Sequence, residues 1–141
     1  MVVVRLGDSE LLIHSPIDLT KNLKEELDQL GEVKYLISPN KIHYWYIEDF
    51  QKIYPDDVTF ASDGVQKRSK KVGKNIRWDK ELKDLKPNYF EGLEIIPIAG
   101  NRFMTEYTFF HFPSNTWIVT DIIENFEAKK INPFFRVLAF I

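Results

Sequence analysis

Apolar and polar positions alternate in short runs at the start of the chain. Val2 to Leu6 and Glu10 to His14 are apolar runs, and the turn residues Gly7-Asp8-Ser9 lie between them. This pattern predicts a hairpin of two strands. Leucines at positions 19, 23, 27 and 30 follow at helical spacing, between Thr20 as a candidate N-cap and Gly31 as a candidate end. The sequence therefore predicts a helix after the hairpin.

Two further short apolar runs, at residues 33–37 and 58–61, predict buried strands. Between them, residues 46–54 predict a short helix that Pro55 ends. Residues 10–61 thus have the order strand, helix, strand, helix, strand. That order favours an α/β sheet with helices packed against it.

The second half of the chain has a less regular pattern. Residues 62–78 are polar and rich in lysine, which predicts a solvated loop rather than a nucleic-acid site, because aromatic residues are not interleaved with the lysines. Residues 93–98 predict a strand. Residues 105–112 and 116–120 predict a hairpin across Pro113-Ser114-Asn115.

The end of the chain is unusually apolar: residues 133–141 include Phe134, Phe135, Val137, Leu138, Ala139, Phe140 and Ile141. A free terminus is seldom so apolar, because it usually frays into water. We expect a final helix here that packs on the sheet of its own chain or of a second copy, which would make a homo-oligomer. A natural chain that continues beyond Ile141 is the other interpretation.

Composition narrows the classes of function. The chain has 141 residues, of which 44% are hydrophobic, and a formal net charge of −2. These values predict one packed domain over residues 1–141, with neither nucleic acid nor a membrane as an obligate partner. There are no cysteines, so disulfides, thiolate zinc ligands and cysteine nucleophiles are excluded. Without a signal peptide or a long apolar run, we expect a cytoplasmic protein.

The strongest candidates for chemistry are His43 and two carboxylates. His43 lies in the loop after the predicted strand 33–37, and α/β sheets place their sites in such loops. We expect Asp121 and Glu106 to lie near it. A histidine beside carboxylates can bind one metal or act as a general acid or base. Alternatively, Asp121 caps the segment that follows it, and Glu106 is an exposed strand residue.

Four more residues are candidate ligand-binding positions: Asn40, Lys41, His111 and Asn125. Lys41 could hold an anionic ligand as a point charge, although a solvated loop lysine also explains it. His111 lies in an aromatic strand, where a structural histidine with satisfied hydrogen bonds is favoured over a ligand.

Residues 34–43, Lys-Tyr-Leu-Ile-Ser-Pro-Asn-Lys-Ile-His, resemble a strand-end motif of the metallo-β-lactamase superfamily. In that motif an apolar strand runs into His-x-His-x-Asp-His. His43 falls on its last histidine. Ser38, Asn40 and Ile42 fall on the first histidine, the second histidine and the aspartate.

A second segment, residues 109–121, resembles the superfamily's later hairpin. Asp121 falls on the aspartate that bridges two metals in active members. The histidine that the superfamily has upstream of this hairpin is not found near residues 100–102, and the last ligand histidine would lie beyond Ile141.

Ser-Pro-Asn-Lys followed by His43, Phe-His-x-Pro-Ser at residues 110–114 and Thr-Asp at residues 120–121 together resemble the uncharacterised DUF4336 family, a degenerate branch of this fold. The resemblance covers most of residues 1–125. It implies a mixed α/β (α+β) fold, a shortened metallo-β-lactamase-like αββα sandwich, in one domain that is cut short at its C-terminus.

The resemblance also implies the loss of the usual zinc chemistry. A catalytic zinc needs about three protein ligands and an open position, whereas only His43 and Asp121 remain here. We therefore expect no metal and no cofactor. The expected function is binding of a small molecule or a protein in the former active-site cleft. The alternative is a remodelled hydrolase that uses His43 and Asp121, either with one divalent metal or by acid/base chemistry.

Overall fold

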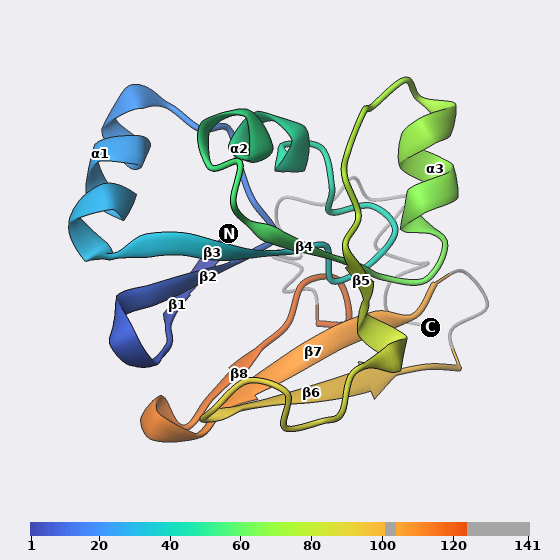
Figure 1. Ribbon diagram of the computed structural model, residues 1–141. Helices are drawn as coiled ribbons and strands as arrows, with labels where there is room; N and C mark the ends of the chain where they lie inside the picture. Colours follow the sequence, from blue (N-terminus) through green and yellow to red (C-terminus); the bar gives the residue numbers. More distant parts are fainter. Residues whose placement is uncertain (101–103, 124–141) are drawn as a thin grey trace, which may run out of the picture.

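The protein is arranged in layers, with helices above one sheet and a second sheet below it (Figure 1). The structure is a computed structural model that describes residues 1–100 and 104–123. The described residues thus form a mixed α/β fold with three α-helices and two sheets.

The first sheet has the strand order β1-β2-β3-β4-β5, in sequence order. β1 is antiparallel to β2, and the remaining neighbours are parallel. Its strands and the helices between them are β1 (Val2–Arg5), β2 (Glu10–His14), α1 (Lys21–Leu30), β3 (Glu32–Ile37), α2 (Ile47–Ile53), β4 (Val58–Ala61), α3 (Val65–Lys71) and β5 (Lys80–Glu81).

The second sheet is antiparallel, with the strand order β6-β7-β8. Its strands are β6 (Leu93–Ile98), β7 (Glu106–His111) and β8 (Thr116–Ile118). Three short 3-10 turns complete the described elements: η1 (Gly7–Ser9), η2 (Leu82–Asp84) and η3 (Phe112–Ser114).

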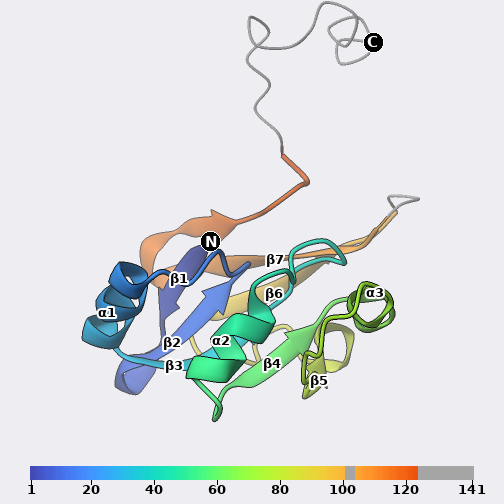
Figure 2. The same ribbon diagram turned by 90° about the horizontal axis from the view of Figure 1, so that it is seen from above.

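All three helices lie in a row on one face of the first sheet (Figure 2). Connections between parallel strands are almost always right-handed. When each new strand lies on the same side of the previous one, every connecting helix therefore lies on the same face of the sheet. From β2 to β5 the strands follow one another in this way. The opposite face is therefore left for the second sheet.

Two apolar clusters hold these layers together. The first joins the two sheets and includes Leu12, Ile37 and Phe60 from the first sheet and Ile95 and Phe109 from the second. The second cluster joins the first sheet to its helices, with residues such as Leu11, Ile13, Leu27, Leu36 and Phe50. Neighbouring residues of β2 belong to different clusters because successive side chains of a strand point to opposite faces.

Most of the predicted elements are confirmed. The hairpin across residues 7–9 is present, with Val2 opposite His14. The side chain of Thr20 caps α1 by accepting a hydrogen bond from the Leu23 amide, and the Gly31 amide donates to the Leu27 carbonyl at the other end. The hairpin of β7 and β8 also forms across η3.

The prediction that residues 62–78 form a loop is wrong for seven of them, because Val65–Lys71 is α3. The helix buries Val65 and Ser69, which are four residues apart and thus on one face. One valine and one serine among lysines do not make a recognisable apolar face, so the sequence did not predict a helix. The two-residue strand β5 was also missed, because it is polar and short.

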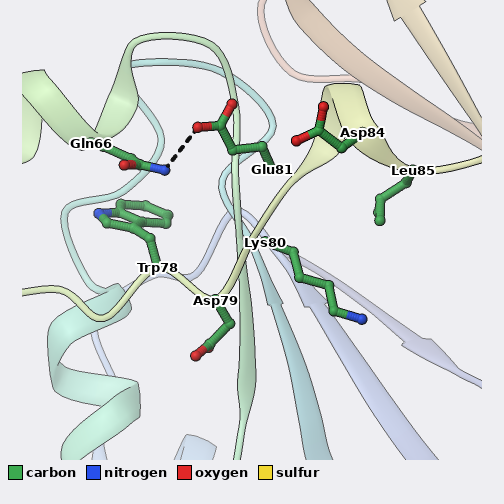
Figure 3. Close-up of a pocket in the computed structure, with 7 residues that line it drawn as sticks. All are labelled: Gln66, Trp78, Asp79, Lys80, Glu81, Asp84 and Leu85. Carbon is green, nitrogen blue, oxygen red and sulfur yellow. Dashed lines mark hydrogen bonds between the residues drawn. The ribbon is translucent and has the colours of Figure 1, made fainter.

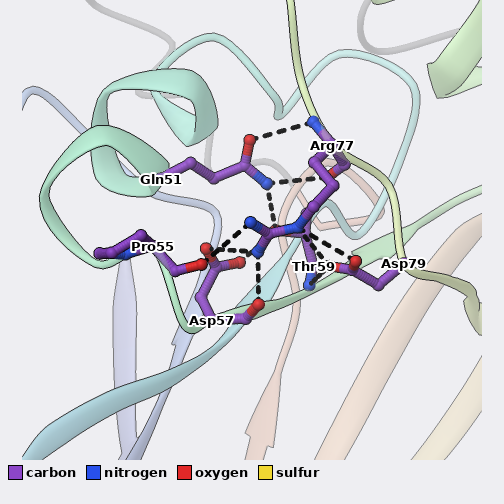
Figure 4. A network of polar contacts seen from close by, with 6 residues as sticks. All are labelled: Gln51, Pro55, Asp57, Thr59, Arg77 and Asp79. Carbon is purple, nitrogen blue, oxygen red and sulfur yellow. Dashed lines mark hydrogen bonds and ion pairs between the residues drawn. The ribbon is translucent and has the colours of Figure 1, made fainter.

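A polar network fixes the segment before β5 against the start of β4 (Figure 4). The Arg77 guanidinium donates to the Pro55 carbonyl at 3.0 Å and to the Asp57 carboxylate at 2.9 Å, and also pairs with Asp79. Gln51 of α2 exchanges hydrogen bonds with the Arg77 backbone. Burial raises the pKa of Asp57, although Arg77 opposes the shift.

The expected final helix over residues 133–141, and with it the expected contact between chain copies, lies outside the described residues. Within residues 1–100 and 104–123, none of the helices combines the length and the apolar character needed to cross a membrane.

Candidate functional site

A cluster of polar side chains gathers where β2 and β3 end beside the second sheet. We call Ser15, Asn40, His43, Glu106 and Asp121 the polar cluster. Because β2 and β3 are parallel neighbours, Ser15 and the loop after Ile37 meet at the same edge of the first sheet. The second sheet supplies the carboxylates, from the start of β7 and from just after β8.

Asn40 lies at the centre of the polar cluster and is fully buried. Its Oδ1 accepts hydrogen bonds from the backbone amides of Ile42 at 2.9 Å and His43 at 3.2 Å. An amide oxygen accepts and an amide nitrogen donates, so these contacts fix the orientation of the side chain. Its Nδ2 therefore points toward the second sheet and donates to Asp121 Oδ2 at 2.8 Å.

Glu106 is the first residue of β7, and only 2% of it is exposed. Its two carboxylate oxygens accept the backbone amides of Thr120 at 2.6 Å and Asp121 at 2.8 Å. Its Oε2 also lies 3.4 Å from Asn40 Nδ2. A carboxylate that accepts several N–H groups can remain buried, because these bonds replace its hydration. Glu106 thus fixes the segment that carries Asp121.

His43 links the two strand-end segments. Its Nε2 lies 3.1 Å from Asp121 Oδ2 and 3.2 Å from Oδ1, and its Nδ1 lies 2.6 Å from Ser15 Oγ. About a third of the His43 side chain and a quarter of the Asp121 side chain are exposed. The pair is therefore ordered by hydrogen bonds and still reaches the surface.

His14 lies directly before Ser15 and is buried, with a T-shaped contact to the Phe109 ring. Neither of its ring nitrogens has a hydrogen-bond partner among the described residues. Burial, assisted by the nearby His43, lowers the pKa of His14 to about 3. Its ring is thus neutral at physiological pH.

A cavity of about 390 Å³ opens beside Ser15 and His43. The rest of its lining is mostly apolar and consists of Met1, Pro16, Ile17, Ile42, Trp45 and Tyr46. Trp45 and Tyr46 are 48% and 39% exposed, although they are large aromatic side chains. This combination of an apolar wall and a few convergent polar groups is typical of small-molecule sites.

A family model described as a domain of unknown function (DUF4336) matches residues 1–134. The chain belongs to this family. No curated protein is recognisably similar to it. Membership in DUF4336 confirms the resemblance at the family level and assigns no activity.

Zinc does not fit the polar cluster of this DUF4336 member. Between the carboxylates of Asp121 and Glu106 lies the amide nitrogen of Asn40, whose N–H groups point at both. A metal ion needs lone pairs at that position, and an N–H donor has none to give. Within residues 1–100 and 104–123, moreover, no group of three or more His, Cys, Asp or Glu side chains could hold a metal ion.

The structure brings together four of the predicted site residues: His43, Asp121, Asn40 and Glu106. Glu106 is buried, so the alternative of an exposed strand residue is wrong. Lys41 lies in the same loop and is partly buried. Asn125 lies outside the described residues.

His111 does not join the polar cluster. It ends β7 whereas Glu106 begins it, and five steps along the strand separate the two by about 17 Å. The Nδ1 atom of His111 lies 2.7 Å from Ser114 Oγ, at the turn before β8. This supports the interpretation of His111 as a structural histidine.

Ser15 is the functional candidate that the sequence prediction missed. A signal was present, since both β2 and β3 are followed at once by Ser-Pro, as Ser15-Pro16 and Ser38-Pro39. Equivalent residues at the ends of neighbouring parallel strands lie at one edge of the sheet. The pairing of β2 with β3 was needed to use this signal.

A second cavity, of about 470 Å³, lies between α3 and β5 (Figure 3). Its lining contains Gln66, Trp78, Asp79, Lys80, Glu81, Asp84 and Leu85. Two of the charged groups here already have partners: Glu81 accepts from Gln66 and contacts Lys83, and Lys80 donates to Tyr89. We therefore place the candidate site at the polar cluster.

Proposed function

We propose that this protein is a degenerate metallo-β-lactamase-like protein that binds a small molecule in the former active-site cleft, without a dizinc centre. The ligand has an apolar group that enters the cavity beside Trp45 and a hydrogen-bonding group that reaches Ser15 and His43. The fold proposed is a shortened αββα sandwich in one domain over residues 1–141.

The layer order supports the fold part of this proposal. Helices, a mixed sheet and an antiparallel sheet follow one another, as the first three layers of such a sandwich would (Figure 1). The residues aligned with the superfamily's ligands, Asn40, His43 and Asp121, converge at one point although up to 81 positions separate them. The arrangement of strand ends is kept, but the amide of Asn40 takes the place of a metal ligand. This favours ligand binding over metal-dependent hydrolysis.

The observation that carries the binding function is the cavity itself. Its volume of about 390 Å³ suits a small ligand, and two of its lining residues, Ser15 and His43, belong to the polar cluster. An apolar wall provides affinity by burial, and a few fixed polar groups provide orientation.

The test uses 4-phenylbutanamide, a neutral probe with a phenyl group and a polar amide. Titration followed by tryptophan fluorescence and ligand-observed NMR should give a Kd on the order of 1 mM, as suits so small a ligand. Trp45→Ala should weaken binding at least about fivefold, because it removes much of the apolar wall.

Trp117→Ala is the matched control. Trp117 is also 48% exposed, but it lies on β8 and does not line this cavity. Its substitution should leave the Kd within about twofold. Equal losses in both variants, or no saturable binding by the wild-type protein, would contradict the proposed site. Metal analysis of protein purified without chelator tests the loss of the dizinc centre. Two tightly bound zinc ions per chain would contradict it.

The second candidate function is a remodelled acid/base hydrolase that uses His43 and Asp121. The distance of 3.1 Å between His43 Nε2 and the Asp121 carboxylate favours it, because a general base needs such an orienting partner. The metal-dependent version of this candidate is less favoured, since Asn40 points N–H groups at the carboxylates.

A further inference from the structure

Ser15 has a backbone conformation that is unusual for its sequence. Its φ angle is 54°, in the left-handed region, and it directly precedes Pro16. Residues before proline are normally extended, and non-glycine residues rarely have a positive φ. The conformation is held by the Ser15 amide, which donates to the Ile37 carbonyl at 3.0 Å. Strained residues of this kind are concentrated at functional sites.

The side chain of Ser15 begins a chain of hydrogen bonds that ends at a carboxylate. Ser15 Oγ lies 2.6 Å from His43 Nδ1, and His43 Nε2 lies 3.1 Å from Asp121 Oδ2. The carboxylate accepts, so Nε2 carries the hydrogen that it receives. In the neutral ring this leaves the Nδ1 lone pair to accept the Ser15 hydroxyl proton.

The carboxylate end of this chain is fixed from behind. Asn40 Nδ2 donates to Asp121 Oδ2 at 2.8 Å, and the Asp121 amide donates to Glu106 at 2.8 Å. The carboxylate therefore holds its orientation toward the His43 ring. A base oriented by a third group is the arrangement that activates a serine hydroxyl.

Ser15 and His43 also line the apolar cavity of about 390 Å³. Ser15 thus lies at the wall of a space that can hold an acyl chain. Only 7% of Ser15 is exposed, so water has limited access to it.

We propose that Ser15 is a nucleophile, activated by His43 and oriented through Asp121, that cleaves carboxylic esters whose apolar acyl group occupies this cavity. Ser15 Oγ bonds to the ester carbonyl carbon while its proton moves to His43 Nδ1. The bond from the carbonyl carbon to the leaving oxygen breaks, and that oxygen takes the proton from His43. Water then attacks the acyl-serine through the same base, which releases the carboxylic acid and restores Ser15.

This inference rests on the cavity of the proposed function and names the chemistry that would occur there. The first test is covalent labelling of the full chain with diethyl p-nitrophenyl phosphate. A serine activated in this way displaces p-nitrophenol and gains a diethylphosphoryl group, which peptide mass spectrometry locates. The expected result is a single label on Ser15.

Ser114 is the internal control for this labelling. Its Oγ lies 2.7 Å from His111 Nδ1, so it also pairs with a histidine, but it is exposed and does not line the cavity beside His43. It should remain unlabelled. Absence of label from Ser15, or equal labelling of both serines, overturns the proposal.

The second test is hydrolysis of p-nitrophenyl butyrate. Ser15→Ala and His43→Gln should each lower kcat/KM at least about 100-fold, and Ser114→Ala should leave it unchanged. Asp121→Asn should lower kcat with little change in KM, because it alters the orientation of His43 and not the cavity. Hydrolysis by Ser15→Ala at the wild-type rate also overturns the proposal.

Binding of 4-phenylbutanamide separates the two ideas. The folded Ser15→Ala variant should bind this probe less than about tenfold more weakly, because it loses one hydrogen bond and keeps the apolar wall. If the probe binds and Ser15 is not labelled, the nucleophile is wrong and the binding function stands. If the probe does not bind, but Ser15 is labelled, the proposed ligand is wrong and the nucleophile stands.

Discussion

Replacing Asn40 by aspartate tests the hydrogen-bond directions at the centre of the polar cluster. The two side chains have nearly the same shape, so packing is preserved. The Nδ2 group, which donates to Asp121 at 2.8 Å and lies 3.4 Å from Glu106 Oε2, becomes an acceptor oxygen. Asn40→Asp therefore places a carboxylate directly against two others.

The size of the effect follows from two contributions. Losing a hydrogen bond to a charged group costs about 1.5–3 kcal/mol. Repulsion between like charges about 4 Å apart costs about 4 kcal/mol at an effective dielectric constant of about 20, and proton uptake or movement relieves part of it. We expect the free energy of unfolding to fall by about 3–5 kcal/mol, as for other broken buried pairs.

For a chain of this size, that loss corresponds to a decrease in Tm of about 10–15 °C. Thermal unfolding followed by circular dichroism measures it at pH 7, with urea unfolding as the check on the free energy. Asn75→Asp, at an exposed loop position, is the control and should change stability by less than about 0.5 kcal/mol. An Asn40→Asp variant that melts within about 1 °C of wild type would show that the amide does not donate to these carboxylates.

Two further substitutions test features of the fold. The folded-state pKa of His14, about 3, lies below the unfolded value of 6.5, so the unfolded chain binds the extra proton and stability is lost as pH falls from 6.5 toward 3. Urea unfolding at pH 7 and pH 5 tests this: the free energy of unfolding of the wild type should fall by about 2 kcal/mol more than that of His14→Phe. Equal decreases in the two proteins would contradict the burial of a neutral ring. Gly31→Ala should lose at least about 2 kcal/mol in the same assay, because its Cβ would lie 2.0 Å from the Ser9 carbonyl oxygen, whereas Gly73→Ala meets open space and should lose only about 1 kcal/mol through its positive φ. If the two alanine variants unfold alike, backbone contact does not restrict Gly31.

Strands β1 to β4 of the first sheet, with α1 and α2, could be predicted because each depends on local pattern. Residues 10–14, 33–37 and 58–61 are apolar runs between turn signals, and Thr20 and Gly31 mark the ends of α1. The helix α3 could not be predicted, because only two buried residues distinguish it from a lysine-rich loop. The spacing of apolar residues along the sequence thus reflects the buried face of an element. Prediction from this spacing fails where that face is small.

Only part of the candidate site could be predicted, and for a different reason. His43, Asn40 and Asp121 were found through the order of motifs, which fixes the strand ends but not the contacts between them. Ser15 contacts His43 across 28 positions, and that contact requires knowing that β2 pairs with β3. His111 was a candidate ligand-binding position, whereas the register of β7 puts it at the far end of the strand from Glu106.

The role of Asn40 links the absence of a zinc geometry to the proposed serine chemistry. In a dizinc site the carboxylate and the histidine would both direct their lone pairs at metal ions. Here the Asn40 amide satisfies the carboxylate of Asp121 by donating to it, and the carboxylate still accepts from His43 Nε2. His43 therefore has one nitrogen committed to Asp121 and the other, Nδ1, directed at Ser15 Oγ at 2.6 Å. A metal on His43 would compete with one of these two contacts, so a zinc ligand and a serine base are alternative uses of this ring. Under the proposal, the exchange of a metal ligand for an amide donor is what makes the His43 ring available as a base.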